Sequence, residues 1–158
     1  MIVRKNIWPA AGFSAIALAA GGLSGFISSS AMKNYETLLQ PPLAPTGWVF
    51  PAMWTVLYIL MGVSAGIVWR RGHGRARSQA LWLWGVQLFF NFCWTFIFFN
   101  LQWRLFAFFW LLVLLALVTA MISRFSRISS AAANLNLPYA LWLCFAGYLN
   151  MGVYLLNG

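Results

Sequence analysis

Long apolar segments alternate with short polar ones along the whole chain. Five of the apolar segments are long enough to form a membrane-spanning helix, which takes roughly 20 residues. They lack the strict alternation over about ten residues that marks the strands of a membrane barrel. The pattern therefore predicts an all-α integral membrane protein, a five-transmembrane-helix bundle that forms a single membrane domain over residues 1–158. The predicted spans lie near residues 7–27, 47–69, 80–100, 104–123 and 134–156.

Polar, basic or proline-rich residues mark the breaks between these spans. Residues 70–79 and 124–133 are basic, and residues 100–104 predict a tight turn. The first loop, residues 28–46, contains three prolines after a short turn expected over residues 34–39. Because proline fixes the backbone, this loop is stiff. It either caps a ligand pocket or simply connects two spans.

The first apolar segment has two interpretations. It follows Arg4 and Lys5, and Ala17-Leu18-Ala19 resembles the cleavage site of a signal peptide. The apolar run continues past this site to Ile27, however, and is long enough to cross a bilayer. This length favours a retained helix.

The distribution of positive charge predicts the orientation of the bundle. Lys33 and Arg104 fall on one side, and the other eight basic residues fall on the opposite side. Because cytoplasmic loops carry the excess of lysine and arginine, we expect a cytoplasmic N-terminus, an outer C-terminus and an outer first loop. Helical spans favour the bacterial inner membrane. The eight residues are Arg4, Lys5, Arg70, Arg71, Arg75, Arg77, Arg124 and Arg127.

Composition excludes several kinds of chemistry. Glu36 is the sole acidic residue and His73 the sole histidine, so neither a carboxylate pair nor a Ser-His-Asp triad can form. Cys93 and Cys144 lack the spacing of metal ligands, and we expect them to act as small buried hydrophobic residues. The net charge of +9 lies at the ends of apolar runs, which favours anionic lipid headgroups over nucleic acid.

Aromatic and amide side chains share one helical face in each of three predicted spans, because they recur at offsets of three or four residues. Amides in lipid need partners, so these faces should point into the bundle. There they would line a ligand cavity, or the amides would merely join helices. The residues are Phe50, Trp54 and Tyr58 in the second span, Gln87, Asn91, Trp94 and Phe98 in the third, and Tyr139, Trp142, Ala146 and Asn150 in the fifth.

Two further patterns concern the surfaces of the helices. Small residues at four-residue spacing predict close helix packing, either within the bundle or in a homodimer. They are Ala17, Gly21 and Gly25 in the first span and Gly62 and Gly66 in the second. Tryptophans near span ends are typical of the aromatic belts at membrane surfaces. They are Trp8, Trp48, Trp69, Trp82, Trp84 and Trp103.

Three ordered motifs resemble those of the tryptophan-rich sensory proteins, a family that includes the mitochondrial translocator protein or peripheral-type benzodiazepine receptor. The resemblance covers roughly residues 7–156 and rests on GWVFPAMWTVLY, QLFFNFCWTFIFF and PYALWLCFAGYLN. It implies a compact five-helix bundle, often dimeric, with a cavity under the first loop for porphyrins, sterols and isoquinoline or benzodiazepine-type ligands. By motif, the resemblance extends the ligand site to Tyr35, Trp54, Asn91, Trp94, Trp142, Ala146 and Asn150.

The chain departs from the family pattern mainly in the first loop. The tryptophan expected before Tyr35 is Asn34, and the usual Lys-Pro is Gln40-Pro41. The Pro-Pro pair further on is Pro45-Thr46. No basic residue follows Tyr154, so the C-terminal sterol motif of vertebrate members is incomplete. We therefore expect the loop to close differently over a ligand.

The resemblance implies a membrane receptor or carrier for protoporphyrin IX or a haem-like tetrapyrrole, with no required cofactor, metal or catalytic residue. Flat rings suit a slot walled by tryptophans, with Lys33 near a propionate. One alternative is an enzyme that degrades porphyrin with light and oxygen, and another is a ligand-sensing regulator or scaffold. The expected ligand-binding residues are Tyr35, Phe50, Trp54, Tyr58, Gln87, Asn91, Trp94, Phe98, Tyr139, Trp142, Ala146 and Asn150.

Overall fold

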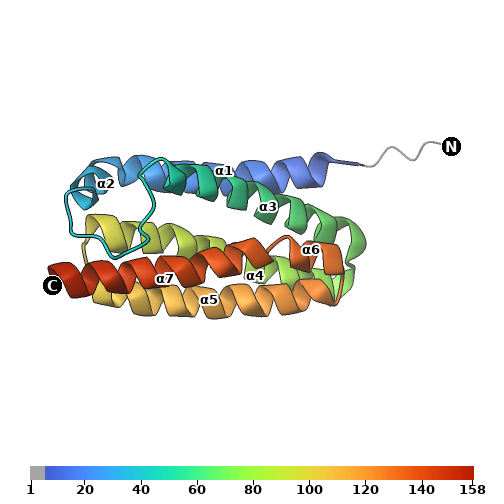
Figure 1. The fold of residues 1–158 in the computed structure, drawn as a ribbon. Helices are drawn as coiled ribbons and strands as arrows, with labels where there is room; N and C mark the ends of the chain where they lie inside the picture. Colours follow the sequence, from blue (N-terminus) through green and yellow to red (C-terminus); the bar gives the residue numbers. More distant parts are fainter. Residues whose placement is uncertain (1–5) are drawn as a thin grey trace.

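A computed structural model describes residues 6–158, and this part of the chain consists of helices and short connections without strands (Figure 1). Five helical segments are long and apolar enough to cross a membrane. The prediction of an all-α integral membrane protein with five spans is confirmed. The helices are α1 (Trp8–Ile27), α2 (Ser29–Tyr35), α3 (Val49–Arg71), α4 (Gly74–Thr95), the π-helix η1 (Phe96–Asn100), α5 (Arg104–Ser126), α6 (Ser130–Asn134) and α7 (Leu137–Asn157).

The long helices form two groups. α1 lies along α3, while α5 packs against both α4 and α7. In Figure 1, α2 and the loop after it lie at the same end of the bundle as the C-terminus of α7, opposite the start of α1. The α1–α3 pair contacts the other group through α4 and α6. The loop thus lies over one end of the bundle, the end at which α7 finishes.

Glycines allow α1 and α3 to approach closely. A Cβ atom added at Gly62 would overlap the backbone of Ser14, and one added at Gly66 would overlap the backbone of Ala10. On the other side of the contact, a Cβ at Gly21 would overlap the ring of Tyr58. Close backbone approach through small residues is a common way to pack helices in lipid. Three of the predicted small residues therefore serve packing within this chain.

The helices extend further into the basic segments than the sequence pattern predicts. α3 continues through Arg71 and α4 begins at Gly74, so only two residues connect them. The apolar pattern underestimates these helices because arginine favours helical structure and its charged end can reach the membrane surface. In the first loop, a helix that was not predicted covers Ser29–Tyr35. The turn predicted over residues 34–39 follows it, where the amides of Thr37 and Leu38 donate to the carbonyls of Asn34 and Tyr35. The basic residues Arg4 and Lys5 lie outside the described residues.

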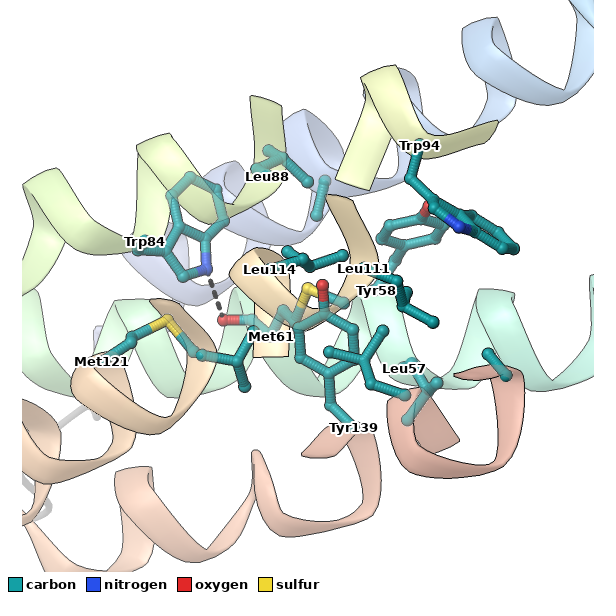
Figure 2. Packing of buried hydrophobic residues seen from close by; sticks show 14 of the residues in the cluster. Leu57, Tyr58, Met61, Trp84, Leu88, Trp94, Leu111, Leu114, Met121 and Tyr139 are labelled. Atoms are coloured by element: carbon teal, nitrogen blue, oxygen red, sulfur yellow. Dashed lines mark hydrogen bonds between the residues drawn. The ribbon is translucent and has the colours of Figure 1, made fainter. Parts of the chain in front are cut away.

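The tryptophans near span ends divide into two kinds. Trp8, Trp48, Trp82 and Trp103 are more than half exposed, and Trp69 is 46% exposed, as a membrane belt requires. The interpretation of Trp84 as a belt residue is wrong, because its side chain is buried. Its indole Nε1 donates to the carbonyl of Met61, 3.1 Å away, and joins α4 to α3 (Figure 2). Residue position in a span cannot distinguish these two roles.

Candidate functional site

A cavity of about 840 Å³ lies under the first loop, between α1, α3, the α4–η1 segment and α7. This volume falls within the range of roughly 300–1,000 Å³ typical of small-molecule sites. Its walls are mainly apolar and aromatic, and residues from Met32 to Gly47 cover it. The first loop is therefore part of the wall of a cavity, and does more than connect two spans.

Nine of the twelve sequence-predicted site residues line this cavity. They come from the loop and from three different spans, so only the tertiary structure brings them together. Gln87, Asn91 and Tyr139 do not line it and instead lie buried below it. The nine lining residues are Tyr35, Phe50, Trp54, Tyr58, Trp94, Phe98, Trp142, Ala146 and Asn150.

Aromatic rings span the gap between α3 and α7. The ring of Trp142 meets Trp54 edge-on at 6.4 Å between centroids and an interplanar angle of 89°. Phe50 meets the same indole at 6.1 Å. Trp54 also stacks on Tyr58 at 5.6 Å. These separations are favourable for aromatic pairs, and they leave flat apolar faces on the cavity wall.

A π-helical turn forms the opposite wall. η1 places Phe98 and the adjacent Phe99 on the cavity, although two consecutive residues of a regular α-helix point in directions about 100° apart. Phe98 stacks on Trp94 at 5.3 Å. Tyr35 of α2 contacts both phenylalanines, at 5.7 and 5.3 Å. π-Turns are frequent at functional sites, and this one was not predicted from the sequence.

The loop is attached to α7 by polar contacts and by close packing. The side chain of Asn157 accepts from the amide of Leu39 at 3.1 Å and donates to its carbonyl at 2.8 Å. The Tyr148 hydroxyl donates to the carbonyl of Pro42 at 2.6 Å. A Cβ atom at Gly152 would lie 2.6 Å from Pro41. The loop therefore covers the cavity in a defined position.

The Tyr35 side chain joins this cover to the cavity wall. Burial raises the pKa of its phenol, because desolvation disfavours the phenolate. The hydroxyl therefore stays neutral throughout the physiological pH range. A neutral phenol fits the apolar surroundings that Phe98 and Phe99 provide.

The three predicted residues below the cavity form a buried hydrogen-bond network with Tyr58. The Tyr58 hydroxyl donates to Asn91 Oδ1, and Asn91 Nδ2 donates to the Tyr139 hydroxyl, both at 2.8 Å. The Tyr139 hydroxyl donates in turn to Gln87 Oε1 at 2.8 Å. Figure 2 shows Tyr58 and Tyr139 among the buried residues of the core. The network joins three spans and ends at the cavity through Tyr58.

Replacing Asn91 with leucine tests this network. Asn91 is 1% exposed, and its loss leaves the Tyr58 hydroxyl without its acceptor and the Tyr139 hydroxyl without one of its two hydrogen bonds. We expect the free energy of unfolding to fall by about 1–3 kcal/mol. Chemical denaturation in detergent measures this change. In a double-mutant cycle with Tyr58→Phe the losses should be less than additive, because both residues belong to one network. Additive losses would contradict the coupling.

Two residues of the cavity wall, Ser24 and Trp142, carry a polar group without a hydrogen-bond partner among residues 6–158. The Ser24 hydroxyl and the Trp142 Nε1 are buried within the wall and are not exposed to the cavity. The predicted role of Lys33 is not supported, because Lys33 is not a lining residue.

The α1 side of the cavity was missed as a binding surface. Gly21, Gly22, Ser24 and Gly25 all line the cavity, whereas the spacing of Gly21 and Gly25 predicts only helix packing. The same small-residue pattern serves both roles, since Gly21 packs on Tyr58 while Gly25 has nothing within 4 Å of an added Cβ. Spacing alone does not distinguish a glycine at a helix contact from one at a cavity.

The amino-acid sequence is similar to those of known proteins. Residues 13–156 match the TspO/MBR family. Tryptophan-rich protein TspO of Chlorobaculum tepidum is 33% identical over 135 residues, which cover 85% of each chain. Protein CrtK of Rhodobacter capsulatus is 37% identical over 90% of this chain and 89% of its own. The translocator protein of Ovis aries is 32% identical over 90% of this chain and 86% of its own. The chain therefore belongs to the TspO/MBR family of membrane proteins.

Proposed function

We propose that this protein is a membrane receptor or carrier whose cavity binds flat hydrophobic ligands, with porphyrins such as protoporphyrin IX as the leading class. The observation that carries the proposal is the cavity of about 840 Å³ walled by Trp54, Trp94 and Trp142. Indole and phenyl faces favour flat rings through stacking and apolar burial. Sterols and isoquinoline or benzodiazepine-type compounds belong to the same hydrophobic class.

The family supports the coarser part of this proposal. TspO/MBR members include translocator proteins and a tryptophan-rich sensory protein, so a sensory or translocator role in a membrane fits the chain. The orientation that we infer places the loop over the cavity on the outer side. It is supported by Arg70, Arg71, Arg75, Arg77, Arg124 and Arg127, which lie at the end of the bundle opposite Lys33 and Arg104.

Filling the cavity from α1 tests whether it is the binding site. Gly25 lines the cavity, and an added Cβ there meets nothing within 4 Å, so Gly25→Leu adds a large side chain at the cavity wall without a clash at its Cβ. We expect the Kd for protoporphyrin IX to rise by about tenfold or more, because the leucine occupies ligand volume. A tryptophan-fluorescence titration in the dark, in non-ionic detergent, measures the Kd.

Gly12→Leu is the matched control for this experiment. Gly12 lies on the same helix, is exposed and also has open space around an added Cβ, but it does not line the cavity. The Kd of Gly12→Leu for protoporphyrin IX should equal that of the wild type. Quenching that does not saturate would mean that porphyrin only partitions into the micelle. Saturable quenching with the same Kd in Gly25→Leu and Gly12→Leu would mean that porphyrin does not bind in this cavity. Repeating the saturated sample under light separates binding from the degradation hypothesis, since an enzyme gives multiple turnovers.

A further inference from the structure

The sole carboxylate of the chain lies at the boundary between the cavity and the surface. Glu36 caps the C-terminus of α2, is exposed, and lines the cavity. A Cβ atom added at Gly47, just before α3, would lie 3.2 Å from Glu36 Oε1. The carboxylate therefore faces across the cover, from the end of the short helix toward the start of the second span.

No positive charge within the cavity balances this carboxylate. Among the described lining residues there is no lysine, arginine or histidine. Gln40, which lines the cavity, replaces the lysine of the Lys-Pro pair in the family pattern. Lys33 is exposed on α2 and does not line the cavity. The charge that a ligand meets at this boundary is thus negative.

The interior of the cavity carries no charge that opposes this preference. Its lining residues are mainly apolar and aromatic, with Trp54, Trp94 and Trp142 among them. The cavity therefore combines a negative outer boundary with flat apolar walls. That combination is complementary to a flat ring with a cationic outer group.

We propose that Glu36 sets the charge preference of the cavity, so that flat aromatic ligands with a protonated amine at the outer end bind better than ligands with carboxylates there. The inference rests on the proposed function of the cavity as a ligand site. Within the flat hydrophobic ligands of that proposal, it ranks aromatic amines above neutral esters. Free diacids such as protoporphyrin IX still bind through the flat ring but rank third, because their propionates meet Glu36 without a compensating cation.

Three porphyrin probes with one ring system test the preference. Protoporphyrin IX, its dimethyl ester and its bis(aminoethyl) amide differ in charge at the same positions of the ring. Fluorescence titration in non-ionic detergent gives the Kd of each probe for the wild type, Glu36→Gln and Glu36→Lys. We expect the wild type to bind the amine most tightly and the diacid most weakly. Glu36→Gln should lower the amine-to-diacid affinity ratio by about three- to tenfold, and Glu36→Lys should reverse the order.

Lys33→Gln is the matched control, since it removes one charge from the same part of the chain outside the cavity. Its amine-to-diacid ratio should stay within about twofold of the wild type, because Lys33, unlike Glu36, does not line the cavity and solvent screens its charge from a ligand inside. Saturable binding with the same ratio in wild type and Glu36→Gln would overturn the charge preference and leave the ligand cavity intact. Failure of all three probes to saturate, or equal binding in Gly25→Leu, would overturn both proposals.

Discussion

Replacing Gly62 with alanine is expected to disrupt the packing of α1 on α3. The new methyl group would overlap the backbone of Ser14, where a side-chain rotation gives no relief. α1 must then move away from α3, and the fit of Gly21 against Tyr58 on the same contact is lost with it. Overpacking of a well-packed core typically lowers the free energy of unfolding by about 1–3 kcal/mol. Because the overlapping atoms are rigid backbone, we expect Gly62→Ala to lower it by about 3 kcal/mol or more.

Gly85→Ala is the matched control for Gly62→Ala. Gly85 is also inside a spanning helix, but an added Cβ meets nothing within 4 Å. Because alanine is the better helix former, this control should be neutral or gain up to ~1 kcal/mol. Chemical denaturation in detergent, followed by circular dichroism and by size-exclusion chromatography, measures both variants. Equal stabilities would show that the α1–α3 contact can relax, contrary to the close packing described above.

Replacing Trp142 with alanine should have the largest effect on ligand binding. Its indole meets Trp54 and Phe50 across the gap between α3 and α7. The variant therefore loses one flat wall of the cavity. Stacking on one aromatic side chain contributes roughly 1–3 kcal/mol, so we expect the Kd for protoporphyrin IX to rise about 5- to 150-fold.

Trp82→Ala controls for the loss of one tryptophan. Trp82 is 73% exposed and does not line the cavity, so this variant should keep the affinity of the wild type while losing a similar share of the fluorescence signal. Trp54→Ala should weaken binding as Trp142→Ala does. Unchanged affinity in both Trp54→Ala and Trp142→Ala would mean that the ligand does not lie between these rings. Free tryptophan in the same detergent corrects for inner-filter loss.

The sequence determined the architecture because lipid imposes a simple rule. Every backbone polar group must be satisfied within the segment, so apolar runs of sufficient length become helices. The same rule places amides toward the interior, and Gln87, Asn91 and Asn150 are indeed buried and hydrogen-bonded. The helical face of Phe50, Trp54 and Tyr58 also follows from spacing alone, since a helix has a fixed period.

Only the tertiary structure separated the residues of the cavity wall from those below it. Tyr139 and Trp142 share one face of α7, yet Tyr139 ends in a hydrogen-bond network and Trp142 lines the cavity. Periodicity gives the direction of a side chain around its own helix but not the distance to the neighbouring helix. That distance depends on contacts far apart in sequence, such as Gly62 against Ser14.

The position of Glu36 also depended on tertiary contacts. The sequence showed a single carboxylate in a proline-rich loop, and a loop has no periodicity from which a direction can be predicted. The attachment of the loop to α7 through Asn157 and Tyr148 fixes where it lies. This attachment places an isolated acidic residue on the wall of the cavity. The sequence by itself thus determined the helices and their inward faces, while packing between distant segments decided the cavity, its cover and its charge.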